Sequence, residues 1–269
     1  MQGTGNDFVI LDTFSQPLSL NSEQIRHIAD RRLGVGCDQV LLIGPSENQE
    51  TDVYYRIFNS DGTEVAQCGN GARCVAVYLN NKGLVKKSNI VAETKSSQLI
   101  LTIDNNHLVT VNMGIPEFEP ARIPLNVDKK LESYSISLGD REIVFGAAAI
   151  GNPHAVIIVE DVDSASVKDT GDILQKHGIF PEGVNVGFVQ ILDRKNIKLR
   201  VYERGSGETL ACGSGACAAV AVAYQHGYLD EDVDVELRGG HLILRWKGIG
   251  ESIYMSGSVE TVYEGEIEL

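Results

Sequence analysis

The sequence predicts an α/β fold in two pseudo-symmetric domains, each a β-rich unit built around a central helix. Its 269 residues correspond to about two domains at roughly 150 residues each. The segment 64–72 reappears at 208–216, with five of its nine positions identical and an offset of 144 residues. Two weaker echoes keep the same order: 6–10 with 152–156, and 36–39 with 183–185. Three matches in one order indicate two halves that share one fold.

In the first half, the pattern predicts a helix, a strand and a second helix. Asn21 with Gln24 three positions later has the form of a capping box, which predicts a helix over 22–31. Alternation of apolar and polar residues over 53–59 predicts a strand. The small and apolar residues of 69–80 predict a helix directly after the first copy of the repeated segment.

The second half repeats this order. We expect a helix over 169–177, a strand over 197–203 and a helix over 213–225, which Gly227 is placed to end. The stretch 114–124 between the halves has three prolines and no periodicity, as is typical of a connection between domains.

We therefore expect an N-terminal domain of residues 1–112, which carries Cys68, and a C-terminal domain of residues 113–257, which carries Cys212.

Composition excludes several function classes. Lys and Arg number 23 against 37 Asp and Glu, and a net charge of −14 would repel phosphate backbones, so we expect no nucleic-acid partner. No apolar run approaches the roughly 20 residues of a membrane span, so we expect no membrane partner. The N-terminus lacks a signal-peptide pattern, and we expect the protein in the cytoplasm.

The chain has five cysteines, an odd number that argues against a disulfide framework. We interpret Cys37, Cys74 and Cys217 as buried structural residues. Cys68 and Cys212 differ because they occupy equivalent positions of the repeat, each at a strand-to-helix turn before a glycine-rich segment. The unpaired amides of a helix start stabilise a thiolate, and they also bind a carboxylate.

If the two halves face one another, both helix starts converge on one carboxylate and place the two thiols on opposite sides of its α-carbon. That arrangement is typical of two-base stereoinversion, in which one thiolate removes the α-proton and the other thiol delivers a proton. Neither motif contains lysine and no complete dinucleotide fingerprint is present, so we expect no cofactor and no metal.

Several short motifs follow one another along the chain: Gly3-Thr4-Gly5-Asn6-Asp7-Phe8, Gly34-Val35-Gly36-Cys37-Asp38-Gln39, Asn59-Ser60-Asp61-Gly62-Thr63, Cys68-Gly69-Asn70-Gly71-Ala72-Arg73, Gly151-Asn152-Pro153-His154, Gly183-Val184-Asn185, Glu203-Arg204-Gly205 and Ala211-Cys212-Gly213-Ser214-Gly215. In these motifs and their order, the chain resembles the diaminopimelate epimerase family over nearly its whole length. The resemblance implies curved mixed sheets, a barrel-like roll around each central helix, an active site in the cleft between the domains, and a homodimer. It also implies that 258–269 complete the N-terminal domain.

The resemblance further implies a cofactor-independent isomerase that interconverts LL- and meso-2,6-diaminopimelate for lysine and peptidoglycan biosynthesis. It assigns acid/base catalysis to Cys68 and Cys212, and modulation of the thiol pKa values to His154 and Glu203. The substrate-binding residues that it implies are Asn6, Gln39, Asn59, Gly69, Asn70, Asn152, Asn185, Glu203, Arg204, Gly213 and Ser214.

Family members usually carry a first strand before the loop that contains Asn6, whereas only Met1 and Gln2 precede that loop here. We therefore expect Asn6 to be less firmly anchored than in the family.

Two alternatives stay open. A racemase of the proline type would share the architecture but act on a substrate without a distal charged end. A non-catalytic redox or metal-binding protein would join Cys68 to Cys212 in a disulfide or use both as zinc ligands.

Overall fold

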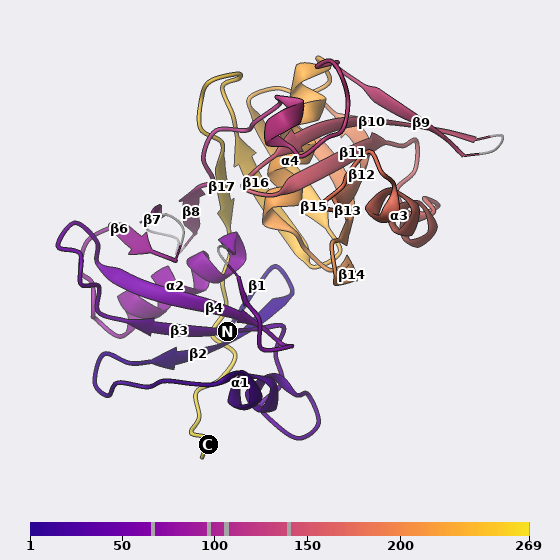
Figure 1. The fold of residues 1–269 in the computed structure, drawn as a ribbon. Coiled ribbons are helices and arrows are strands. Elements are labelled where there is room, and N and C mark those ends of the chain that lie inside the picture. The colour runs from indigo at the N-terminus through magenta and orange to yellow at the C-terminus, as the bar shows by residue number, and fades with distance from the viewer. Residues whose placement is uncertain (66–67, 96–97, 105–107, 139–140, 269) are drawn as a thin grey trace. The chain divides into compact units, whose positions relative to one another are not determined.

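The computed structural model describes residues 1–65, 68–95, 98–104, 108–138 and 141–268. The chain forms two compact units (Figure 1). Unit 1 comprises Met1–Asn112 with Ser256–Leu269, and unit 2 comprises Met113–Met255. The fold combines mixed β-sheets with few helices, which confirms the predicted α/β class.

Unit 1 is built on a mixed sheet. Its strands are β1 (Gln2–Gly3), β2 (Asn6–Asp12), β3 (Gln39–Gly44), β4 (Val53–Asn59), β5 (Glu64–Val65), β6 (Asn89–Glu93), β7 (Gln98–Ile103) and β8 (Val109–Asn112). β2 runs parallel to β3, and β4 runs parallel to β6. The remaining pairs, β1–β2, β3–β4, β4–β5, β6–β7 and β7–β8, are antiparallel.

Two helices cover opposite faces of the sheet in unit 1, α1 (Ser22–Ala29) and α2 (Gly69–Asn81). Leu42 belongs to the core cluster that contains the buried face of α1. Its neighbour Leu41 lies against Gly71 of α2. Adjacent strand residues point to opposite faces, so α1 and α2 pack on different sides of β3.

The predicted capping box of α1 is confirmed, because the Asn21 side chain accepts from the amides of Glu23 and Gln24. The helix ends at Ala29, two residues before the predicted end. Asp30 is extended, and its carboxylate accepts from the amides of Arg32 and Leu33, so the chain turns away there.

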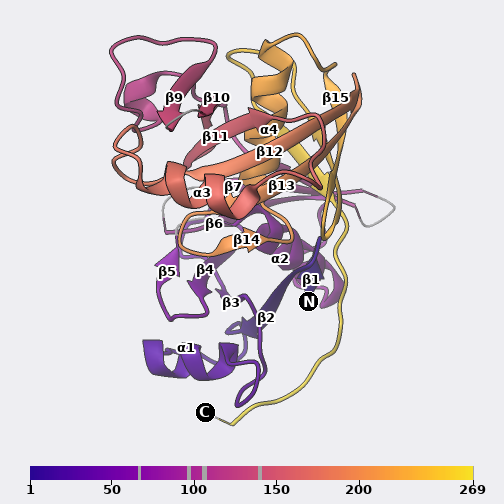
Figure 2. The ribbon, with the colours of Figure 1, turned by 90° about the vertical axis from the view of Figure 1, so that its right-hand side faces the viewer.

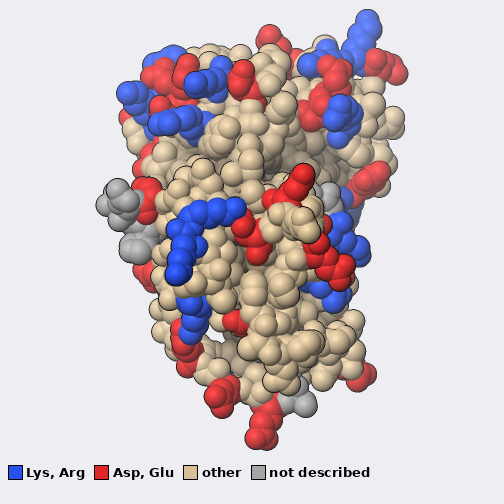
Figure 3. Space-filling model, turned by 90° about the vertical axis from the view of Figure 1, so that its left-hand side faces the viewer, with Lys and Arg blue, Asp and Glu red and all other residues tan. Residues whose placement is uncertain are grey.

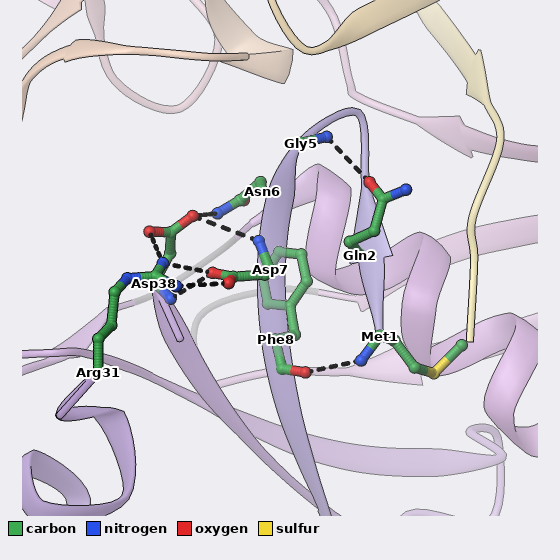
Figure 4. A network of polar contacts seen from close by, with 8 residues as sticks. All are labelled: Met1, Gln2, Gly5, Asn6, Asp7, Phe8, Arg31 and Asp38. Atoms are coloured by element: carbon green, nitrogen blue, oxygen red, sulfur yellow. Dashed lines mark hydrogen bonds and ion pairs between the residues drawn. The ribbon is translucent and has the colours of Figure 1, made fainter. Parts of the chain in front are cut away.

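The loop that carries Asn6 is anchored, and the expectation of a weakly held Asn6 is wrong. β1 pairs with β2 in the register Gln2↔Asp7, and the amine of Met1 donates to the carbonyl oxygen of Phe8 at 2.9 Å. The Gln2 side chain accepts from the amide of Gly5 at 2.9 Å inside the turn (Figure 4). These bonds hold the turn on both sides of Asn6.

Unit 2 repeats the order of unit 1. Its elements are η1 (Pro120–Arg122), β9 (Tyr134–Leu138), β10 (Arg141–Ala149), β11 (Pro153–Ile158), α3 (Val167–Lys176), β12 (Asn185–Asp193), β13 (Asn196–Glu203), β14 (Gly207–Thr209), α4 (Gly213–Gln225), β15 (Asp232–Leu237) and β16 (Gly240–Arg245). β11–β12 and β13–β15 are parallel, whereas β9–β10, β10–β11, β12–β13, β13–β14 and β15–β16 are antiparallel. β17 (Tyr254–Gly257) carries the chain back into unit 1.

In unit 2, strands surround α4 while α3 lies on the other side of the sheet (Figure 2). Val201 of β13 lies beside Gly215 of α4, and the next residue, Tyr202, lies against Gly171 of α3. The two helices therefore cover opposite faces of β13, as α1 and α2 do in unit 1.

The strand registers confirm that the two halves share one fold. Phe8 pairs with Gln39 in unit 1, and His154 pairs with Asn185 in unit 2, at an offset of 146 residues for both partners. The helix predicted over 213–225 matches α4, and Gly227 follows it with φ of 76°. The duplication therefore extends from local motifs to strand order.

On the face drawn in Figure 3, Lys and Arg are interspersed with Asp and Glu, with other residues between them. The acidic excess of the sequence is therefore mixed with basic groups on this face. Among the described residues, no helix is both long and apolar enough to cross a membrane. The absence of a nucleic-acid partner stays a prediction.

Candidate catalytic half-sites

Cys68 is the N-cap of α2 and forms the centre of a polar cluster in unit 1. Its backbone is extended, with φ of −147° and ψ of 112°, and its Sγ accepts from the amide of Gly71 at 3.5 Å. A Cβ on Gly71 would lie 3.3 Å from side-chain atoms of Phe8 and Leu41. The tight packing at this position leaves little room for a side chain beside the cysteine.

Amide side chains lie at the start of α2 and at the paired ends of β3 and β4. The Sγ of Cys68 donates to Oδ1 of Asn6 at 3.9 Å, and Nδ2 of Asn70 donates to the same oxygen at 3.4 Å. Nε2 of Gln39 donates to Oδ1 of Asn59 at 2.9 Å. Oε1 of Gln39 and Oδ1 of Asn70 are buried acceptors for which the described part of the chain provides no hydrogen-bond donor.

Cys212 is the N-cap of α4 in unit 2 and repeats the geometry of Cys68. Its backbone has φ of −124° and ψ of 110°, and its Sγ accepts from the amide of Gly215 at 3.4 Å. The Oγ of Ser214 lies 3.6 Å from the same sulfur. A Cβ on Gly215 would lie 3.2 Å from that sulfur, so glycine leaves space at the helix start. Both cysteines are placed at helix starts as predicted.

Burial and a neighbouring carboxylate determine the direction in which the pKa of the Cys212 thiol is shifted. Burial raises the pKa of its thiol well above the usual value, and the negative charge of Glu203 raises it further. Hydrogen bonds from Ser214 and the Gly215 amide favour the thiolate but do not outweigh these effects. The helix start therefore favours the Cys212 thiolate as expected, but burial and the neighbouring carboxylate outweigh it and the thiol pKa is raised overall.

His154 at the start of β11 is buried and neutral. Its Nε2 lies 2.9 Å from Oδ1 of Asn152 and 3.1 Å from Oγ of Ser214. Burial lowers its pKa to about 3, with a further contribution from the positive charge of Arg204. A proton on Nε2 satisfies the Asn152 oxygen. His154 therefore connects to the Cys212 sulfur through the hydroxyl of Ser214.

Asn185, Glu203 and Arg204 lie on adjacent strand ends of unit 2. The amide of Arg204 donates to Oδ1 of Asn185 at 2.9 Å, and Nδ2 of Asn185 donates to the carbonyl oxygen of Pro153 at 3.1 Å. The Arg204 guanidinium donates to the carbonyl oxygen of Glu182 at 2.7 Å. Thr209 donates from its hydroxyl to the carboxylate of Glu203. Backbone contacts therefore hold Arg204 in place.

The structure also shows a duplicated ion pair that our sequence reasoning missed. Arg56 binds Glu64 through Nε and Nη2, both at 3.0 Å. Arg200 binds Glu208 through the same two nitrogens, at 2.7 and 3.1 Å. The first pair joins β4 to β5 and the second joins β13 to β14, the short strands that precede Cys68 and Cys212. The offset of 144 residues, already seen for the cysteines, was the signal that could have identified both pairs.

The residues implied by the resemblance divide into two half-sites, one in each unit. Unit 1 holds Asn6, Gln39, Asn59, Cys68, Gly69 and Asn70; unit 2 holds Asn152, His154, Asn185, Glu203, Arg204, Cys212, Gly213 and Ser214. Each half-site presents a cysteine, helix-start amides and amide side chains. Within the described ranges, no group of three or more His, Cys, Asp or Glu side chains could hold a metal ion.

Solved structures that share the fold include proteins described as an epimerase, a racemase and a phenazine biosynthesis protein. A hydroxyproline epimerase from Agrobacterium vitis has a TM-score of 0.67 at 16% identity, with 96% of this chain and 87% of that chain covered. A probable proline racemase from Agrobacterium radiobacter has a TM-score of 0.70 at 16% identity, covering 100% and 91%. A phenazine biosynthesis protein of the PhzF family from Bacillus anthracis has a TM-score of 0.66 at 18% identity, covering 96% and 92%.

The family match, together with the fold and the repeated cysteine-capped helices, places the protein in the epimerase and isomerase class. The family model described as diaminopimelate epimerase matches residues 1–119 and 146–262, which is most of the chain. The chain belongs to the diaminopimelate epimerase family.

Proposed function

We propose that this chain is a cofactor-independent epimerase that interconverts LL- and meso-2,6-diaminopimelate, with Cys68 and Cys212 as the acid/base pair. The observation that carries the proposal is the repeated half-site, in which a cysteine caps a helix and its sulfur accepts from an amide of the first turn. Two thiols at equivalent positions of one fold supply the two bases that inversion of a single stereocentre needs.

The groups around each thiol suit an amino acid as substrate. Unpaired amides at the starts of α2 and α4 bind the carboxylate of the reacting carbon. The buried acceptors of Gln39 and Asn70 provide oxygen atoms for a substrate ammonium group. Arg204 offers a planar guanidinium for the distal carboxylate of diaminopimelate.

In the proposed reaction, a thiolate removes the α-proton and the opposite thiol donates its own proton to the other face of the carbon. The first sulfur leaves this step protonated and the second leaves it as a thiolate, so charge and protons balance. The high pKa of Cys212 supports the thiol form there in the free protein. Cys68 then acts as the base in the direction of reaction in which Cys212 donates its proton. The two roles exchange in the reverse direction.

The test is α-proton exchange followed by NMR in D₂O, with purified reduced protein, LL-diaminopimelate and no added cofactor. We expect deuterium incorporation with conversion toward the meso form, lost in Cys68→Ala and in Cys212→Ala. Cys217→Ala is the matched control, because Cys217 is buried one turn further along α4. Full exchange in either active-site variant would contradict the two-thiol mechanism.

The pH dependence provides a second test of the same chemistry. Turnover should fall at acid pH as the thiolate is protonated and at alkaline pH as the donor thiol is lost. A flat profile between pH 6 and about 10, with the chemical step shown to limit the rate, would contradict a thiol pair.

Proline-type substrates are the second candidate, because proteins described as a hydroxyproline epimerase and a proline racemase share this fold. Arg204 separates the candidates, since a proline-type substrate has no distal charge for it to bind. Arg204→Ala should impair turnover of diaminopimelate while Cys68 and Cys212 stay reactive toward alkylating agents. An unchanged rate would favour the proline-type alternative.

A redox or zinc-binding role predicts a disulfide or stoichiometric metal on purified protein. Thiol titration and metal analysis under reducing conditions test it.

The proposal also includes a homodimer in the cytoplasm, where thiols are kept reduced, and a place in lysine and peptidoglycan biosynthesis. Sedimentation measurements test the dimer directly.

A further inference from the structure

An ion-pair network in unit 1 ends on Asn6 (Figure 4), whose side-chain oxygen accepts from the thiol of Cys68. Arg31 binds both carboxylate oxygens of Asp7 at 2.8 Å and donates to Oδ1 of Asp38 at 2.9 Å. The backbone of Asp7 and that of Asp38 each donate to the other's carboxylate, at 3.2 and 2.7 Å. Oδ2 of Asp38 accepts from Nδ2 of Asn6 at 3.0 Å.

This network determines which way the Asn6 amide points. A carboxylate is an acceptor only, so Asn6 must turn its NH₂ group toward Asp38. Its carbonyl oxygen then faces the opposite side, where it accepts from Cys68 at 3.9 Å and from Asn70 at 3.4 Å. Rotation of the amide by half a turn would place an NH₂ group against the sulfur and an oxygen against the Asp38 carboxylate.

We propose that Asp38, held by Arg31, is a positioning residue that makes Asn6 present an acceptor to the Cys68 thiol. An acceptor at this place favours the S–H form of Cys68, whereas a donor would favour the thiolate. Asp38 therefore acts on the thiol through the orientation of one amide. The inference rests on the proposed function, because it assigns a control element to one of its two acid/base groups.

The equivalent asparagine of unit 2 is held by a different group. Asn152 contacts the buried, neutral His154 at 2.9 Å. In the repeat, Phe8 of unit 1 is equivalent to His154 of unit 2, and Val184 of unit 2 is equivalent to Asp38 of unit 1. Neither orienting group therefore has a counterpart in the other unit. Cys212 in the same molecule is therefore an internal control for a change at position 38.

The experiment compares Asp38→Asn with Asp38→Ala and follows alkylation of each cysteine by iodoacetamide from pH 6 to pH 10, with peptides resolved by mass spectrometry. Both variants remove one negative charge. In Asp38→Asn, Arg31 should retain the side-chain oxygen, so the new NH₂ group takes the place of Oδ2, where it loses the bond from the Asp7 amide, faces Asn6 and makes Asn6 rotate. The alanine variant offers no such donor. Tyr55 and Cys74, both buried, are titratable groups of unit 1 that interact with Cys68, and both variants leave them unchanged.

We expect Cys68 to react roughly fivefold faster near pH 7 in Asp38→Asn than in Asp38→Ala, which is the effect of about one hydrogen bond. The Cys212 profile should stay the same. Equal Cys68 profiles in the two variants would overturn the proposal, since charge alone would then explain the change. Glu264→Gln, which removes the exposed Lys82–Glu264 pair of unit 1, is the control for loss of a surface ion pair.

Asn6→Ala tests the same idea without altering the Arg31 network. It removes the acceptor and should also speed alkylation of Cys68, although less than Asp38→Asn does. An unchanged rate would overturn the proposal. The buried Cys74 reports folding, because it stays unreactive while unit 1 is intact. Alkylation needs no substrate, so this test fails or succeeds separately from the epimerase assay.

Discussion

Replacement of Arg200 by Gln tests how strongly the ion pair of unit 2 holds the strands that lead to Cys212. Arg200 makes two bonds to Glu208, at 2.7 and 3.1 Å, and two to the carbonyl oxygens of Val162 and Asp163, at 2.9 and 3.2 Å. The side chains of Arg200 and Glu208 are 15% and 21% exposed. Loss of the cation would therefore leave the Glu208 carboxylate and the carbonyl oxygen of the buried Val162, which are poorly solvated, without this donor.

The magnitude follows from these contacts. A hydrogen bond to a charged group contributes about 1.5–3 kcal/mol to the free energy of unfolding. Complete loss of the four bonds that Arg200 makes would therefore cost more than this. Arg238 still contacts Glu208 at 3.0 Å, and the new Gln side chain can keep one bond. We therefore expect a loss of about 2–3 kcal/mol in the free energy of unfolding of unit 2. With a slope of about 2 kcal/mol per molar urea, the midpoint should fall by roughly 1 M.

Trp246 provides the assay. It is the single tryptophan of the sequence and lies buried in unit 2, so its fluorescence follows urea unfolding of that unit. Arg56→Gln is the matched control, because Arg56 makes the equivalent pair in unit 1 at 34% exposure. This substitution should lower the free energy of unfolding of unit 1 by about 1 kcal/mol or less. Alkylation of the buried Cys74 measures the unfolding of unit 1. An unchanged fluorescence midpoint in Arg200→Gln would refute the reasoning.

Three further predictions concern acid stability, packing and thiol reactivity. The pKa of His154 is lowered to about 3 against an unfolded value near 6.5, so the unfolded chain binds more protons in this range. The stability that depends on neutral His154 is therefore complete above pH 6.5 and decreases toward pH 3, by up to about 1.4 kcal/mol per pH unit. The fluorescence assay at pH 4 and 7 checks this, and His154→Gln should weaken the slope; the same slope in both proteins would contradict it. Gly171→Ala should destabilise unit 2 by about 1–3 kcal/mol, because the new Cβ would lie 2.5 Å from the ring of Tyr202; a rise in the urea midpoint would show that helix propensity dominates. Cys68 is partly exposed and should be alkylated at pH 8 well before the buried Cys212, whose thiol pKa is raised; peptide mass spectrometry measures both rates, and faster labelling of Cys212 would be contrary to the structure.

Local patterns predicted the elements that depend on neighbours in sequence. The strand predicted over 53–59 matches β4, because alternation of buried and half-buried residues is encoded within the strand itself. The Asn21 capping box and the glycine after α4 are equally local devices. α3 begins at Val167, two residues before the predicted start, since no side-chain cap marks its beginning.

Properties that depend on tertiary packing could not be predicted in the same way. The position of Cys212 at a helix start follows from its sequence, but its raised pKa comes from burial and from Glu203 across the turn. Arg31 and Asp38 reach the Asn6 loop from more than twenty positions away, and no periodicity connects them. Internal repetition was the strongest long-range signal, because it related residues 144 positions apart without any contact between them.

The return of the chain to unit 1 after β17 has a consequence for folding during synthesis. Gln2 exchanges two backbone hydrogen bonds with Glu260, both 2.9 Å, and Thr110 shares a bond with Ser256. A ribosome must therefore complete the whole of unit 2 before it supplies these partners. Until then β1 keeps an open edge, which is prone to pair with other chains. Unit 2 is continuous in sequence and can acquire its core earlier. Unit 1, most of which is translated first, is therefore the last unit to complete its strand pairing.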